Sequence, residues 1–396
     1  MMKISMKELR TLAYLGILLV STGCNDNLDI PTAGDFSEEP AFSRSSTLLK
    51  GEPLKVLSRN LYLGGNTDLV FQADMNDPVA VFQAAATVWG QIQNSNFPER
   101  AKALADEIQE GRPHVVTLQE VPHFLILDGA FNPTGEVDHL GILMGEIEAR
   151  GLPYRVEAVQ NNTVAVMPTG LDFTTYQVTQ WVRYTDRIAV LVREDLPVSG
   201  MDQGNYGASF ALSEDLELLR GWIRVSAEID GVPYHFVSTH LEVQGLAPIQ
   251  AAQVQELLGS ILNDLNGITV LSGDLNSDAA AGPGATSWTP TYGTLMDAGF
   301  QDAWLLAHPG RATDGMTCCQ AKTLDNPTSI LNERIDFVLL RANDRRGGEK
   351  RFPGMIGVEK VGDEIGDKTY PSGLWPSDHA GLLASLRFPA PLFNDF

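Results

Sequence analysis

The stretch from Ile268 to Asn276 constrains the fold more than any other part of the sequence. An apolar, β-branched run of strand length stops at Gly273 and is followed by Asp274 and Asn276. In extended backbone, residues two apart point to the same side, so a carboxylate and an amide would leave the end of a buried strand together. Such a pair can bind a metal, position a water or stabilise an oxyanion. The alternative is a strand that ends in an ordinary Asx turn.

Composition bounds the class of protein. The 396 residues are 43% hydrophobic and 20% charged, which is typical of a folded globular body. Acidic residues outnumber basic ones 50 to 28, and the resulting net charge of −22 disfavours, without excluding, a nucleic-acid substrate. The three cysteines, Cys24, Cys318 and Cys319, form neither a disulfide framework nor a zinc-finger spacing.

The N-terminus has the pattern of an export signal. Basic residues precede the apolar run 12–20, and small residues lead to Cys24. The run is too short for a stable membrane span. Small residues before a cysteine resemble the lipobox of bacterial lipoproteins, although Ser21 stands where leucine is usual. We expect a lipoprotein-type signal peptide over 1–24, lipidation at Cys24, and export to the periplasmic or extracellular face of the cell envelope. An ordinary cleaved signal or an uncleaved amphipathic start is the alternative.

Residues 25–52 are polar, lack apolar periodicity and are expected to be a flexible tether. The folded domain is expected over 53–390, with the turn Asp230-Gly231 joining two adjacent strands.

Residues 121–137 are expected to be a loop, 161–186 a polar insertion and 199–210 irregular. Strands are predicted at 54–60, 114–120, 153–160, 187–193, 222–225, 234–240, 268–274, 334–340 and 380–386, and helices within 78–110, 138–150, 247–264 and 292–307. This alternation indicates a mixed α/β or α+β domain.

Polar residues of catalytic type repeatedly follow these apolar runs. Strand ends that meet at one edge of a sheet are a usual place for a site in α/β folds. No single one of these residues is specific. The pieces are Asn60, Gln119-Glu120, Ser238-Thr239-His240-Leu241, Gly273-Asp274-Leu275-Asn276, Arg334-Ile335-Asp336-Phe337 and Ser377-Asp378-His379.

In that order, the pieces resemble the endonuclease/exonuclease/phosphatase superfamily, which includes DNase I-like nucleases, inositol polyphosphate phosphatases and bacterial sphingomyelinases. The resemblance spans residues 54–387. It implies a DNase I-like two-sheet β-sandwich flanked by helices, and a divalent cation, Mg²⁺ or Mn²⁺. Glu120 matches the metal carboxylate, Asn60 would complete the site, and Asp378 would be a second metal contact or a loop cap. Where many nucleases carry Asp or Asn, this chain has Tyr62, as sphingomyelinase-like members do.

The resemblance also assigns catalytic roles. His379 matches the general base and Asp336 its orienting acid, whereas pairing of Asp336 with Arg334 is the structural alternative. Asp274 and Asn276 would position the attacking water and hold phosphoryl oxygens. His240 matches the histidine that hydrogen-bonds the phosphate or protonates the leaving oxygen; a purely structural histidine is the alternative.

The expected function is hydrolysis of a phosphoester by water, by a monomer tethered to a membrane through its lipid. A sphingomyelinase-like phospholipid phosphodiesterase is the leading hypothesis. A secreted nuclease acting on DNA or RNA, and a catalytically silent surface lipoprotein, are the alternatives. Cys318 and Cys319 are expected either to form a vicinal disulfide before Asp336 or to stay reduced.

Overall fold

The structure is a computed structural model that describes residues 52–387, except 75–76, 213–215, 230–231 and 344–354. The predicted signal peptide, Cys24 and most of the tether therefore lie outside the described residues, as does the turn Asp230-Gly231. Within the described part of the chain, no helix is long and apolar enough to cross a membrane.

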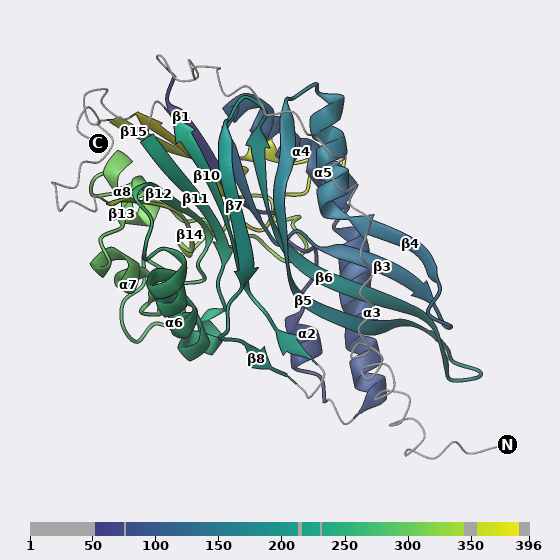
Figure 1. The fold of residues 1–396 in the computed structure, drawn as a ribbon. Helices are drawn as coiled ribbons and strands as arrows, with labels where there is room; N and C mark the ends of the chain where they lie inside the picture. Colours follow the sequence, from purple (N-terminus) through teal and green to yellow (C-terminus); the bar gives the residue numbers. More distant parts are fainter. Residues whose placement is uncertain (1–51, 75–76, 213–215, 230–231, 344–354, 388–396) are drawn as a thin grey trace, which may run out of the picture.

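Two large sheets form the centre of the fold (Figure 1). The first sheet has eight strands in the order β15-β16-β1-β2-β6-β3-β4, with β5 paired to β6. Its strands are β1 (Leu54–Asn60), β2 (Val115–Gln119), β3 (His123–Asp128), β4 (Pro133–Asp138), β5 (Tyr154–Asp172), β6 (Gln177–Arg193), β15 (Met355–Val361) and β16 (Gly381–Arg387). The second has six strands in the order β13-β14-β12-β11-β10-β7. They are β7 (Val198–Asn205), β10 (Gly221–Ile229), β11 (Val232–His240), β12 (Gly267–Asp274), β13 (Gln301–Asp302) and β14 (Asp336–Asn343).

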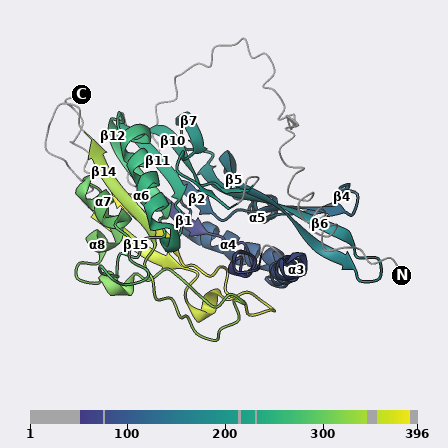
Figure 2. The ribbon, with the colours of Figure 1, turned by 90° about the horizontal axis from the view of Figure 1, so that it is seen from below.

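Helices cover the outer face of each sheet (Figures 1 and 2), and a two-stranded ribbon is part of neither sheet. The helices are α2 (Asp68–Phe71), α3 (Pro78–Asn94), α4 (Phe97–Gly111), α5 (His139–Ala149), α6 (Ala247–Glu256), α7 (Thr291–Asp297) and α8 (Ala303–Ala307); the ribbon is β8 (Phe210–Ala211) with β9 (Glu217–Leu218). The predicted helix 247–264 ends as α at Glu256 and continues as one π-turn, Leu257–Ile261. This arrangement is the predicted two-sheet sandwich flanked by helices.

Alternating side chains divide the core into layers. In β2, Val115 joins the cluster between the two sheets, whereas Val116 and Leu118 join the cluster under α4 and α5. Period-two alternation places these neighbours on opposite faces of one strand. Val270 and Leu271 of β12 divide in the same way between the inter-sheet cluster and the one under α6 and α7. Both central strands are therefore buried on both faces, as their continuous apolar runs predict.

Three irregular predictions are wrong. Residues 121–137, expected to be a loop, form most of the hairpin β3–β4, and 161–186 belongs largely to the long hairpin β5–β6. Residues 199–210, expected to be irregular, contain most of β7. Many residues of 161–186 and 199–210 are polar because these strands pair by backbone hydrogen bonds on exposed surfaces, where side-chain apolarity is not required. The run 124–127 within β3 is apolar, and its strand signal was overlooked. The predicted hairpin between β10 and β11 is confirmed by their antiparallel pairing.

Candidate active site

Strand register brings the predicted polar residues to one end of the sandwich. β1 and β2 run parallel with Asn60 opposite Gln119, so Glu120 follows beside Asn60. In the other sheet, β11 and β12 run parallel with His240 opposite Asp274. The antiparallel pair β12 and β14 then sets Asp274 opposite Asp336. Residues that are distant in sequence thus leave neighbouring strand ends of two facing sheets.

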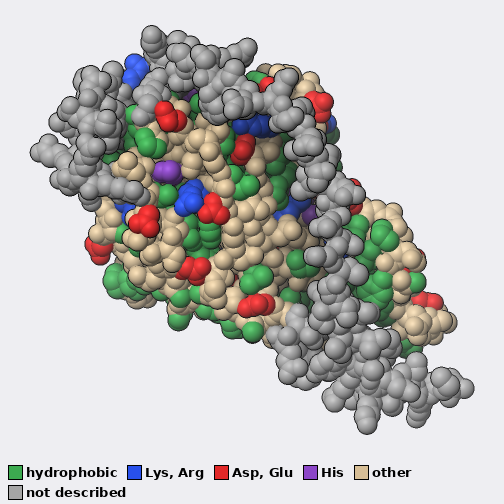
Figure 3. Space-filling model, in the orientation of Figure 1, with side chains coloured by type: hydrophobic (Ala, Val, Ile, Leu, Met, Phe, Trp, Pro, Cys, Tyr) green, Lys and Arg blue, Asp and Glu red, His purple; other side chains and the backbone are tan. Residues whose placement is uncertain are grey.

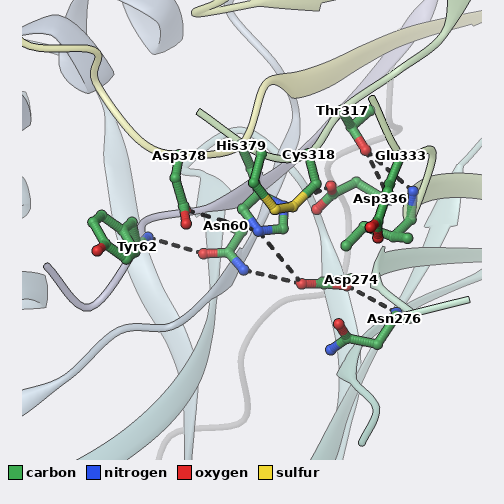
Figure 4. Close-up of a disulfide and its surroundings, with 12 residues drawn as sticks. Asn60, Tyr62, Asp274, Asn276, Thr317, Cys318, Glu333, Asp336, Asp378 and His379 are labelled. Atoms are coloured by element: carbon green, nitrogen blue, oxygen red, sulfur yellow. Dashed lines mark hydrogen bonds and ion pairs between the residues drawn. A yellow bond between two sulfur atoms is a disulfide. The ribbon is translucent and has the colours of Figure 1, made fainter. Parts of the chain in front are cut away.

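Asn60 joins the two sheets across the site. Its fully buried amide Nδ2 donates to Glu120 Oε1 at 3.1 Å and to Asp274 Oδ2 at 3.1 Å. Its Oδ1 accepts from the backbone N of Tyr62 at 2.9 Å (Figure 4). The second oxygen of Glu120 accepts from Leu63 N at 2.9 Å. One amide therefore spaces a carboxylate of the first sheet from a carboxylate of the second.

The backbone turns sharply where these strands end. Tyr62, Glu120 and Asn276 have φ of 58°, 48° and 49°, a left-handed conformation that non-glycine residues adopt rarely and often at functional sites. The prediction that Asp274 and Asn276 share one face of an extended strand is therefore wrong. The two residues converge through an Asx turn instead, in which Asn276 N donates to Asp274 Oδ1 at 2.9 Å. Gly273 is required here, since a Cβ would lie 2.0 Å from Thr239 O.

His379 and Asp336 form a directly bonded pair. The His379 Nδ1 lies 2.8 Å from Asp336 Oδ2, which leaves Nε2 facing Asp378 Oδ1 at 3.8 Å and Asp274 Oδ2 at 3.9 Å. Arg59 donates a hydrogen bond to the His379 carbonyl, which holds the backbone of that segment in place. The structural alternative for Asp336 is wrong, because Arg334 pairs with Asp302 at 2.5 Å.

A loop before β14 ties the histidine and its acid together. The Thr317 hydroxyl accepts from Asp336 N at 3.1 Å, and the Thr317 carbonyl accepts from Ala380 N at 2.7 Å. Cys318 and Cys319 are joined as a vicinal disulfide next to His379, so the oxidised alternative holds (Figure 4). The disulfide directly follows Thr317, whose hydrogen bonds reach Asp336 and the residue after His379.

The charges of the cluster shift its acid–base equilibria. Burial, and then the nearby Asp336, raise the pKa of Asp274 to about 7. Burial alone would lower the pKa of His379, but the carboxylates of Asp336 and Asp378 outweigh it and raise that pKa to about 10. Closely spaced carboxylates cannot all ionise without a compensating positive charge. A divalent cation among them would supply that charge and would free His379 from its proton.

His240 is held in the opposite state. Burial, followed by the positive charges of Arg220 and His379, lowers its pKa well below the ordinary value, so the ring is neutral. Its Nε2 lies 3.1 Å from Asn276 Nδ2 and 3.6 Å from Asp274 Oδ2. A neutral ring can donate one hydrogen bond and accept one. It is suited to hydrogen bonding rather than to donating a proton outright.

The donor set fits a hard divalent cation. Ligand atoms of Glu120, His240 and Asp274 lie within 4.8 Å of one another, and so do those of Asp274, Asp336 and His379. Among the described residues, the buried Oδ1 atoms of Asp336 and Asp378 have no hydrogen-bond partner. Carboxylate oxygens left without donors match the oxygen ligands that Mg²⁺ and Mn²⁺ prefer.

Sequence reasoning missed the cations that border this cluster. Lys322 Nζ lies 3.4 Å from Asp378 Oδ2, and Tyr62 Oη donates to the Lys322 carbonyl at 3.0 Å. Arg220, just before β10, contacts the His240 ring and pairs with Glu242. Neither cation stands at the end of an apolar run. The sequence offered only an indirect signal for them. A chain with so many acidic residues needs local positive charge wherever it binds an anionic substrate.

The comparisons with known proteins agree with this geometry. The model of the Endonuclease/Exonuclease/phosphatase family matches residues 88–379, which is more than half of the chain. The chain therefore belongs to the endonuclease/exonuclease/phosphatase family. It is, accordingly, a hydrolase of phosphoric esters, as the members of this family are.

Solved structures are similar to the chain at low sequence identity. A family protein from Leptotrichia buccalis is 16% identical with a TM-score of 0.51, covering 85% of this chain and 100% of that one. An endonuclease/exonuclease/phosphatase from Beutenbergia cavernae is 17% identical with a TM-score of 0.48, covering 85% of this chain and 72% of that one. Caenorhabditis elegans TDP2 in a truncated form is 18% identical with a TM-score of 0.46, covering 86% and 99%. A search of curated protein sequences found no match.

Proposed function

We propose that the chain is a divalent-metal-dependent phosphodiesterase in which water attacks phosphorus directly. One observation carries the proposal: the Asn60 amide bridges Glu120 and Asp274 at 3.1 Å each, beside the hydrogen-bonded pair of His379 and Asp336. Family membership supports the reaction class. The side chains of a base, its orienting acid and a set of metal-type oxygens thus meet at one buried end of the sandwich.

Mg²⁺ or Mn²⁺ is the proposed cofactor. Glu120 and Asp378 would supply oxygen ligands, and Asn60 would keep Glu120 oriented toward the cation through its amide. When bound, the cation neutralises charge on the phosphoryl oxygens and on the carboxylates. We infer that this neutralisation also returns His379 toward the basic form that the reaction needs, because the acids that raise its pKa would then be paired.

The protein's own groups divide the remaining work. Asp336 holds the Nδ1–H of His379, so that Nε2 can accept a proton from the attacking water. Asp274 lies 3.9 Å from that nitrogen and would help to orient the water. Asn276 and neutral His240 would donate hydrogen bonds to phosphoryl oxygens, whose charge grows in the transition state.

For the substrate we propose a phospholipid-type phosphodiester, as in sphingomyelinase-like members. The net charge of −22 supports it, since a long polyanion is repelled by such a surface. On the face drawn in Figure 3, acidic side chains are scattered among fewer basic ones, with no continuous basic track. The predicted lipid at Cys24 would place the enzyme at a membrane. The alternative substrate is a nucleic acid. The alternative role for the chain is that of a catalytically silent surface lipoprotein.

A side-by-side assay tests the proposal. Purified protein with Mg²⁺ is given sphingomyelin vesicles, plasmid DNA and bis-p-nitrophenyl phosphate, each with an EDTA control. Hydrolysis of the lipid and the small diester, abolished by EDTA, is expected. Nicking of plasmid at trace enzyme would make the enzyme a nuclease. Absence of hydrolysis for every phosphoester, in a protein that is folded by circular dichroism, would leave the silent role.

A further inference from the structure

The guanidinium of Arg220 lies at the border of the site and has no role in the scheme above. Its Nη2 donates to Glu242 Oε1 at 3.1 Å, and its Nε points to Glu242 Oε2 at 3.4 Å. The side chain of Glu242 is 1% exposed and that of Arg220 is 16% exposed. One edge of the guanidinium is therefore held in a fork by a buried carboxylate, and the other edge is left for a different partner.

The carboxylate in that fork is itself firmly placed. Glu242 N donates to Gln253 Oε1 at 2.9 Å, and the Glu242 carbonyl accepts from Gln250 Nε2 at 2.6 Å. The same Gln250 nitrogen also donates to the Asn276 carbonyl at 2.7 Å. Two glutamines of α6 thus tie the support of Arg220 to a loop that carries a site residue. Such backing holds the guanidinium in one position before any ligand arrives.

The free edge of the guanidinium faces the site. Nη1 lies 3.0 Å from Nδ1 and 3.2 Å from Nε2 of His240. One nitrogen so close to both ring nitrogens cannot make two in-plane hydrogen bonds to them. Nη1 therefore keeps donor capacity that the imidazole does not satisfy. A positive donor of this kind, next to a neutral ring, is a binding place for an anionic oxygen.

Two buried acids lie near Arg220 and keep it charged. Glu242 pairs with it directly, and the negative charges of Glu242 and Asp186 raise the pKa of its guanidinium. The fork occupies the Glu242 carboxylate, and the His240 ring next to Nη1 is neutral. The positive charge at the Nη1 edge is therefore available to an anionic oxygen.

We propose that Arg220 is a substrate-binding residue whose Nη1 edge holds a non-bridging phosphoryl oxygen beside His240. The inference rests on the proposed phosphodiesterase activity. It identifies the positively charged side chain that binds the phosphate of the substrate. Glu242 is its positioning residue. A guanidinium is required, because an ammonium at the same place has one centre of charge and cannot keep the fork on Glu242 while reaching the phosphoryl oxygen.

Arg220→Met and Arg220→Lys test the assignment, with Arg224→Met as the matched control. Arg224 lies four residues further along, in β10, pairs with Asp202 at 2.9 Å and belongs to no site contact. Arg220→Met leaves Glu242 buried without its partner and can misfold, so the double variant Arg220→Met/Glu242→Gln, which removes both charges, is made as well. The binding of inorganic phosphate in the presence of Mg²⁺ is measured by calorimetry, and KM and kcat are measured on bis-p-nitrophenyl phosphate.

We expect Arg220→Met and the double variant to bind phosphate at least about tenfold more weakly and to raise KM by a similar factor. Arg220→Lys should lie between them and the parent. Half-saturation by Mg²⁺ should stay within about twofold, because Arg220 does not contact the carboxylate oxygens that fit the metal. The control should match the parent in all three quantities.

Unchanged phosphate affinity in a folded Arg220 variant would overturn the assignment, and so would a parent that binds no phosphate. A parent that binds phosphate through Arg220 yet hydrolyses no phosphoester would sustain the assignment and refute the proposed phosphodiesterase. The two proposals therefore fail by different results.

Discussion

The site and the outer part of the β5–β6 hairpin differ in what holds them. In the site, Asn60 of the first sheet and Asp336 of the second are 0% and 1% exposed, and their hydrogen bonds reach residues from the other sheet or from distant loops. The outer part of the β5–β6 hairpin projects from the body as an arm (Figure 2). Its tip carries Phe173 and Tyr176, which are 73% and 56% exposed. The arm is built from local strand pairing, and none of the predicted site residues lies on it.

The difference shows what each region requires. Buried polar groups are costly unless every partner is present, so the site depends on contacts between segments far apart in sequence. Arg100 illustrates this, because its fully buried guanidinium donates to the carbonyls of Leu61, Tyr62 and Pro376. The arm has no such dependence. Substitutions in the site should therefore abolish activity, and substitutions on the arm should leave catalysis of a small soluble substrate unchanged.

The largest contrast is expected between His379 in the site and His123, a histidine of β3 outside it. His379→Ala should lower kcat about 10³-fold or more, because the proposed base for the attacking water is lost. His123 of β3 bears an exposed contact to Glu136 at 2.9 Å, and His123→Ala should keep the parent's rate within about twofold. Both rates are measured on bis-p-nitrophenyl phosphate with Mg²⁺. Equal rates for the two variants would erase the distinction between the site and the strands outside it.

Asp336→Asn should lower kcat about 10²- to 10⁴-fold, since the amide cannot support the imidazolium that forms as water is deprotonated. The pH profile should also move. Asp336 raises the pKa of His379, so its loss lowers that pKa, and the acidic limb of the residual activity should shift to lower pH. A pH–rate profile at saturating Mg²⁺ checks the direction. An unmoved limb, or one at higher pH, would disconnect Asp336 from the base.

Glu120→Gln should weaken Mg²⁺ binding by at least about tenfold, because a neutral amide replaces a charged oxygen ligand. In the parent, a saturating cation should raise the unfolding temperature by several degrees, since it binds the folded state only. Most of that gain should vanish in the variant. Thermal scans with Mg²⁺ and with EDTA measure it. Glu136→Gln in β4, where the side chain is 63% exposed, is the control and should keep the full gain.

The smallest effect is expected at the arm tip. Phe173→Ser and Tyr176→Ser should change the free energy of unfolding by no more than about 0.5 kcal/mol, because exposed side chains contribute little packing. Turnover of the small diester should also stay within about twofold. Denaturant titration and the standard assay check both. A large loss of turnover would mean that the arm contributes to the site after all.

The sequence predicted the site and the arm unequally. Apolar runs gave β1, β2, β11, β12 and β14, since strands buried on both faces must be apolar. The polar residues at the ends of these strands then gave most of the site. The inner parts of β5 and β6 were predicted as the strands 153–160 and 187–193, but the outer part, 161–186, escaped prediction because it carries many polar residues and lacks the alternation that marks a half-buried sheet. Arg220 and Lys322 escaped because their contacts exist only after distant segments pack together.

Asn276 shows a limit of a different kind. Its convergence with Asp274 was predicted from strand periodicity, yet the structure achieves it through a left-handed turn. The residue types were informative because their chemistry suits the site. The backbone conformation that brings the two side chains together depends on Gly273 and its close contact with Thr239. Local periodicity cannot encode that contact, which forms between neighbouring strands.

The most direct test of the account is the metal dependence of hydrolysis in the parent and in Glu120→Gln, measured side by side on one phosphodiester. The account predicts that the parent is active with Mg²⁺ or Mn²⁺ and inactive in EDTA, and that the variant needs at least about tenfold more cation for half of its maximal rate. Equal rates in Mg²⁺ and EDTA, or the same cation requirement in both proteins, would contradict the claim that Glu120 helps to hold a metal that the reaction needs.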